Sequence, residues 1–159
     1  MKKIISANDL LLQNTINNKI LSELCKVNDD IKEYGLFITK EDAKELVCTR
    51  NKALMKNGRV EFKETIIMEI IKKFSPSPYI MKSNYRDIFC ELVEIFYEYK
   101  NETLEVLGDE ELIDAMVDYF NNYCQGSIEL LEGKALYKVA ENVRMGLNDP
   151  FDISDEKDQ

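Results

Sequence analysis

The side chains with the clearest chemical potential are four carboxylates within residues 84–100. They recur at intervals that place them on one face of a helix: Asp87, Glu91, Glu94 and Glu98. Helical bundles that hold two metal ions use inward-facing glutamates, but they add a histidine three residues after a glutamate on two helices. The chain has no histidine. The four acids also lie opposite the apolar positions of their helix, so we expect a solvated face and no metal site.

One arginine interrupts an apolar stripe. Arg50 falls in the middle of a helical stripe formed by Ala43, Leu46, Val47 and Leu54. Because an unpaired buried cation is costly, we expect an ion pair with a neighbouring carboxylate. Glu61 and Glu129 are the candidate partners, since both lie near predicted turns. Two alternatives stay open: the guanidinium reaches solvent along its aliphatic stem, or it binds an anionic ligand in a cleft with Arg59 and Glu61.

The remaining catalytic patterns are missing from the sequence. Without histidine there is no Ser-His-Asp or Cys-His pair and no histidine-bound zinc or haem. The four cysteines form no CxxC motif, and the chain has neither a GxGxxG sequence nor a phosphate-binding loop. Cys124 precedes a predicted helix, where the helix dipole lowers a thiol pKa, but we interpret it as a packing residue. We therefore predict no cofactor and no catalytic residue.

The size and charge of the chain argue against several further classes of protein. The 159 residues are 45% hydrophobic, which is enough for one domain with its own core. A net charge of −9 argues against nucleic acid and anionic membranes as partners. No apolar run is long enough to span a bilayer. The widely spaced cysteines fit the reduced cytoplasm of a bacterium.

Helical periodicity runs through nearly the whole chain. Apolar residues recur every three or four positions over residues 16–34, 43–54, 66–74, 88–99, 112–120 and 130–143. Gly35 and the prolines at 76 and 78 separate segments, and Thr39 is expected to cap the second helix. Residues 59–62 are too few to distinguish a strand from a loop. We expect an all-α, single-domain bundle of about six helices over 1–147, and an acidic, disordered tail over 148–159.

Several stretches resemble a family of small acidic bacterial proteins. In the sequence they are Thr49–Leu54, Gly58–Phe62, Ser77–Ile80, Ile95–Glu102, Asp109–Ile113 and Cys124–Ser127. The resemblance covers about residues 8 to 145. The family is a domain of unknown function found mainly in anaerobic Gram-positive bacteria. The resemblance implies a single cytosolic domain and supplies no catalytic residue.

These observations favour a cytosolic helical module that binds another protein in a regulatory or accessory role. The alternative is a domain that binds or transforms a small anionic ligand in a cleft around Arg50, Arg59 and Glu61, with Glu129 as a further member of this polar cluster. A homodimer is compatible with either role. An exposed apolar patch would favour the first function, and a deep pocket lined by arginine and glutamate would favour the second.

Overall fold

The computed structural model describes residues 7–61 and 65–154, with side chains described from residue 14 onward. These residues form helices and loops without a strand, which confirms the all-α prediction. There are six helical segments in this part of the chain. They are α1 (Ala7–Ile31), α2 (Lys40–Lys56), α3 (Thr65–Phe74), α4 (Tyr85–Glu102), α5 (Asp109–Asp118), and a last segment of α6 (Ile128–Leu130), a π-helical turn (Leu131–Ala135) and α7 (Leu136–Arg144). A short 3-10 turn follows α1, and a π-helical turn at Tyr119–Tyr123 extends α5.

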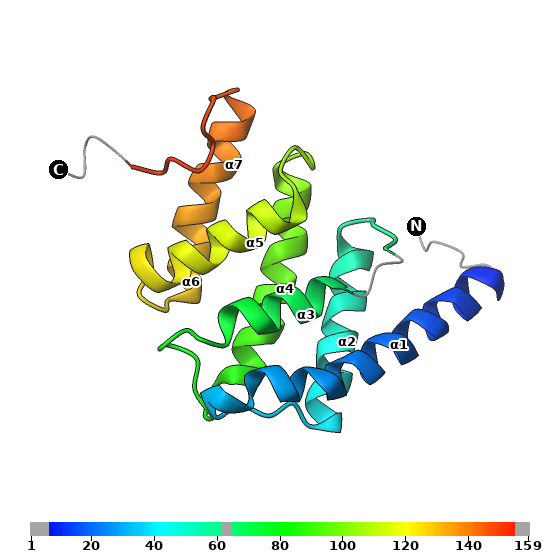
Figure 1. The fold of residues 1–159 in the computed structure, drawn as a ribbon. Coiled ribbons are helices and arrows are strands. Elements are labelled where there is room, and N and C mark those ends of the chain that lie inside the picture. The colour runs from blue at the N-terminus through cyan, green and yellow to red at the C-terminus, as the bar shows by residue number, and fades with distance from the viewer. Residues whose placement is uncertain (1–6, 62–64, 155–159) are drawn as a thin grey trace.

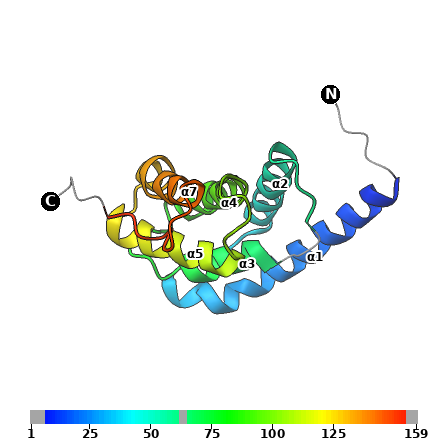
Figure 2. The ribbon, with the colours of Figure 1, turned by 90° about the horizontal axis from the view of Figure 1, so that it is seen from above.

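The helices stack in two layers (Figures 1 and 2). α2, α4 and α7 lie side by side in one layer, and α1, α3 and α5 form the other. The chain alternates between the layers: each helix of one layer is followed by a helix of the other, and the resulting pairs α1–α2, α3–α4 and α5–α7 lie next to one another. As a consequence, α2, α4 and α7 run in the same direction, and each has its carboxyl end uppermost in Figure 1, with the end of α7 highest and that of α2 lowest.

One connected apolar core fills the space between the layers. Each of the six segments contributes fully buried side chains, among them Ile20, Leu46, Ile70, Phe96, Leu112 and Leu136. The rings of Phe74 and Phe120 meet edge to face, with centroids 5.6 Å apart, and connect α3 to the end of α5. This packing fixes the direction of the helices and therefore the place where each helix ends.

Several predicted helix ends are confirmed. Thr39 caps α2: its hydroxyl accepts a hydrogen bond from the Asp42 amide, and the Asp42 carboxylate accepts one from the Thr39 amide, each at 3.0 Å. Gly35 adopts φ +77° directly after the 3-10 turn. α4 differs, because the Asn84 side chain accepts from the amide of Met81 and does not cap its own helix. Residues 59–61 form a loop, and Phe62 lies outside the described residues.

The first part of the expected tail is held against the fold. The buried Asn142 amide group donates to the carbonyls of Pro150 at 3.1 Å and Asp152 at 3.0 Å. The Tyr119 hydroxyl donates to the carbonyl of Phe151, whose ring is half-buried against the core. Composition predicts disorder here, but these side-chain donors fix the backbone of residues 150–152. Residues 155–159 lie outside the described part of the chain.

Candidate functional site

Arg50 is buried within α2, beneath the loop that follows this helix. Only 1% of the residue is exposed, as its place in the apolar stripe predicts. One terminal nitrogen, Nη1, donates to Oδ1 of Asn51 at 3.0 Å, and the other, Nη2, donates to the backbone carbonyl of Glu61 at 2.9 Å. The guanidinium therefore fixes the path of the loop at residues 57–61 by bonding to its backbone.

Two buried oxygens lie in the same region without a hydrogen bond of normal geometry: Oε1 of Glu61 and the hydroxyl of Tyr97. Burial raises the pKa of the Glu61 carboxyl group, although Tyr97, Arg50 and Arg59 act in the opposite direction. Burial also raises the pKa of Tyr97, and the neighbouring Glu61 adds to this effect. The cluster is thus desolvated, and the tyrosine stays neutral at physiological pH.

Arg59 connects this buried cluster to the surface. Its guanidinium forms an ion pair with Glu105, which lies in the loop after α4. The pair joins the loop after α2 to the loop after α4. The structure therefore brings Arg50, Arg59 and Glu61 together. It adds Tyr97 and Glu105, which the sequence did not single out because their proximity arises only when α2 packs on α4.

A buried lysine supports the loop after α4 from below. The ammonium group of Lys100 donates to the Leu107 carbonyl and pairs with Oδ1 of Asp109 at 2.8 Å. The buried hydroxyl of Thr103 donates to the Tyr99 carbonyl at 2.6 Å. Because these bonds hold both ends of residues 103–108, the loop has a defined conformation.

The three parallel helices end in the same way. In each, the second amide beyond the helix cap donates to a carbonyl five residues earlier: Arg59 to Leu54 at 2.8 Å, Glu105 to Lys100 at 3.0 Å and Leu147 to Asn142 at 3.1 Å. The residue before that amide has positive φ: Gly58 (+65°), Leu104 (+55°) and Gly146 (+71°). This is the Schellman motif, in which glycine is favoured because it adopts positive φ without strain. α4 carries a leucine at this position, and the residue that follows it, Glu105, also has positive φ (+59°).

These helix ends expose a set of apolar side chains. Six residues are between 48% and 74% exposed, and we call them the apolar end: Met55, Val60, Leu104, Val106, Met145 and Leu147. They surround the ends of α2, α4 and α7, which Figure 2 shows from above. The ion pair of Arg59 with Glu105 links α2 to α4, and that of Arg144 with Glu102 links α4 to α7.

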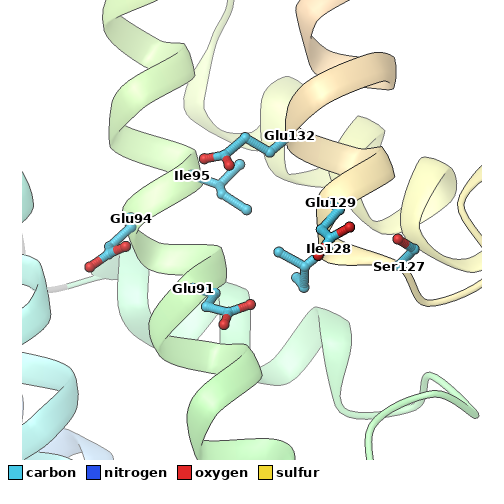
Figure 3. A pocket seen from close by; sticks show the side chains of 7 residues that line it. All are labelled: Glu91, Glu94, Ile95, Ser127, Ile128, Glu129 and Glu132. Carbon is cyan, nitrogen blue, oxygen red and sulfur yellow. The ribbon is translucent and has the colours of Figure 1, made fainter.

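Glu129 lies in a different place. It lines an open cleft of about 640 Å³ between α4 and α6 (Figure 3). The other lining residues are Glu91, Glu94, Ile95, Ser127, Ile128 and Glu132. We call this the acidic cleft. The structure thus separates Glu129 from the Arg50 cluster, because the turn that carries Glu129 packs on the opposite side of α4 from α2.

Carboxylate pKa values are raised at Glu91, which lines the acidic cleft, and at Glu98, which contacts the cleft residue Glu132. Glu91 and Glu94 are exposed, as expected for a solvated face. Burial and the contact with Glu132 raise the pKa of Glu98 to about 7. Burial and the nearby acids, Asp87 first, raise the pKa of Glu91. Within the described residues no group of acids and cysteines has the arrangement of a metal site.

Cys124 is buried, and burial raises its thiol pKa to about 11. A protonated, inaccessible thiol is a poor nucleophile at neutral pH, which supports its interpretation as a packing residue.

The two helical layers, the connected core and the polar cluster below the apolar end define an all-α protein, and none of its described helices has the length and apolarity that a membrane crossing requires. The chain belongs to a family described as "Family of unknown function (DUF6323)", whose model matches residues 23–149. Neither a curated protein nor a solved structure matches the chain.

Proposed function

We propose that this protein is a non-catalytic module that binds another polypeptide chain through the apolar end. The observation that carries the proposal is Leu104. A non-glycine residue in the left-handed region costs roughly 1–2 kcal/mol, and here the strained backbone displays a large apolar side chain to solvent. Neither the backbone nor the core gains from leucine at this position. A contact surface would gain from it.

The apolar end is large enough to be an interface. Taking about 180 Å² as the full surface of a residue of this size, the six residues expose on the order of 700 Å². This sum, taken over the ends of three helices, is close to the roughly 800 Å² that one partner contributes to a specific interface of standard size. This area supports protein binding as the function.

The surface is also held in place before any partner binds. Arg50 fixes the loop after α2, Lys100 supports the loop after α4, and Arg59 joins the two loops. A preorganised surface loses less conformational entropy on association than a mobile one. The buried arginine therefore acts as a positioning residue beneath the interface.

The alternative of a small-molecule site around Arg50, Arg59 and Glu61 has less support. The Arg50 guanidinium is directed to its own chain, and Arg59 is paired with Glu105. The acidic cleft lies at a distance from this cluster and would repel an anionic ligand. A nucleic acid or an anionic membrane would be repelled by the net charge of −9.

We also propose a reduced bacterial cytosol as the compartment. Cys25 and Cys48 are exposed free thiols, which would be prone to oxidation in an extracellular setting. This location agrees with the anaerobic Gram-positive bacteria that the sequence resemblance indicates.

The proposal is tested by affinity capture followed by reconstitution. Tagged wild-type protein is compared with the variants Leu104→Asn and Val106→Asn, and with Met81→Asn, which removes an apolar side chain that is 52% exposed from the loop between α3 and α4. We expect a captured protein that both apolar-end variants lose and that Met81→Asn retains, and that binds again when purified. A purified partner that binds all four proteins equally would contradict the proposal.

A further inference from the structure

We infer that the apolar end receives a second copy of this chain, so that two molecules pack end to end. This inference rests on the proposed function, since it names the partner of the same surface. Three properties of the apolar end favour a second copy: its charge, its area and its arrangement about α4.

Three ion pairs balance opposite charges around the apolar end. Arg59 pairs with Glu105, Arg144 with Glu102, and Lys100 with Asp109. The chain as a whole carries −9, and the acidic cleft adds repulsion on the outer side of α4. Two copies of an acidic protein repel each other when acidic surfaces meet, but here a neutral, apolar surface meets its own equivalent. A neutral face on an acidic molecule suits a partner with the same charge.

The area agrees with a dimer of moderate stability. Two copies that cover on the order of 700 Å² each would bury about 1,400 Å² in total, within the range of about 1,200–2,000 Å² for specific interfaces. Contact through exposed side chains at the helix ends, without a deep pocket for an anchor, predicts an affinity in the micromolar range.

The arrangement of the helix ends allows a two-fold axis. α4 lies between α2 and α7 in Figure 2, so the carboxyl end of α4, which Leu104 follows, lies between those of the other two helices. An axis near Leu104 would place it against its equivalent in the second copy. The same rotation would bring Met55 and Val60, at the end of α2, against Met145 and Leu147, at the end of α7. Each apolar side chain would therefore meet an apolar group, as an isologous interface requires.

The test is light scattering of the purified full chain during size-exclusion chromatography, from about 5 µM to about 0.5 mM. We expect the mean mass to rise from 18.5 kDa toward twice that value as the concentration increases. Leu104→Asn should weaken the association at least tenfold, because asparagine accepts positive φ without distorting the loop but removes the central apolar contact. Met81→Asn should behave as wild type. Added salt should leave the association unchanged or strengthen it, since it screens the repulsion between acidic molecules.

A mass of 18.5 kDa at every concentration would overturn the inference. Equal association by Leu104→Asn and wild type would also overturn it, because the contact would then lie elsewhere. Circular dichroism of each variant shows that the fold is intact. The proposed function is judged separately: a monomeric protein that binds a different purified protein through Leu104 would refute the second copy and retain the interface.

Discussion

At the scale of single residues, the apolar end depends on a mismatch between side chain and backbone. Three parallel helices end in the same motif, and two of them have glycine at the position with positive φ. In α4 this position is Leu104, which is exposed. Glycine after a helical pattern is a recognisable helix end in a sequence, but a leucine gives no signal for a left-handed conformation. This residue was therefore beyond sequence reasoning.

Replacing Leu104 by glycine should stabilise the isolated protein. Relief of the left-handed conformation outweighs the greater entropy of the unfolded glycine, so we expect a gain of about 0.5–1 kcal/mol in the free energy of unfolding. Urea denaturation at low protein concentration measures this change. In the reverse control, Gly58→Ala should lose about 1 kcal/mol, since a Cβ at Gly58 has open space and only the backbone conformation opposes it. A loss of stability for Leu104→Gly would show that leucine is needed for the fold.

Removing the polar group of Arg50 should destabilise the protein, whereas removing that of Tyr97 should not. Arg50→Met leaves the Glu61 carbonyl without its donor in a buried site, so we expect a loss of about 2–3 kcal/mol and a melting temperature lower by several degrees. Tyr97→Phe removes a hydroxyl that makes no hydrogen bond of normal geometry, so stability should stay equal or rise by up to about 1 kcal/mol. Calorimetry of both variants checks the pair, and an equal loss in both would disprove this assignment.

At the scale of helices, sequence periodicity located the segments well but not their contacts. The caps at Thr39 and Gly35 and the stripe that buries Arg50 were predictable, because they depend on neighbours along one helix. The acidic cleft was not, because Glu129 and Glu132 approach α4 only through the packing of the last segment. The raised pKa of Glu98 could not be predicted from the acids of α4 alone, because it depends on burial and on the contact with Glu132.

The acidic cleft predicts a pH-dependent stability. Burial and the contact with Glu132 raise the pKa of Glu98 from 4.5 to about 7, so the folded state binds this proton more tightly than the unfolded state. The resulting stabilisation is complete below pH 4.5 and is lost as the pH rises through about 7. Because Glu98 is partly exposed, we expect a loss on the order of 1 kcal/mol between pH 5 and pH 8.

Glu98→Gln should flatten this part of the pH profile and make the protein more stable than wild type at pH 8. Glu61 and Glu91, whose pKa values are also raised, leave a residual slope of the same sign. Glu94→Gln, an exposed exchange on the same helix, serves as the control. Urea denaturation across this pH range decides the matter, and a wild-type stability that increases from pH 5 to pH 8 would disagree with the proton-linked contact.

The segment after α7 should depend on one buried amide. Asn142→Ala removes the amide group that donates to the carbonyls of residues 150 and 152. We expect faster hydrogen exchange over 148–154 and a loss of about 1–3 kcal/mol in the free energy of unfolding. Asn122→Ala is a matched control, since the Asn122 amide bonds to Asp118 on the exposed surface. Unchanged exchange in Asn142→Ala would mean that the packing of Phe151 alone holds the segment.

At the scale of the whole molecule, the all-α fold followed from periodicity, while the two-layer arrangement did not. Stacking of helix pairs points three carboxyl ends in the same direction. Only in that arrangement do the exposed residues Val60, Leu104 and Leu147 belong to the same end of the molecule. The net charge of −9 was known from composition. The pairing of opposite charges at the apolar end depends on contacts between segments that are far apart in the sequence, Arg59 with Glu105 and Arg144 with Glu102.

The most direct test of the apolar end as an interface is site-specific photo-cross-linking in living cells. A photoreactive amino acid at position 106 should give a defined protein adduct, whereas the same group at position 81 should give none. We expect an adduct of twice 18.5 kDa that contains only this chain. No adduct at position 106, or the same adducts from both positions, would contradict the account.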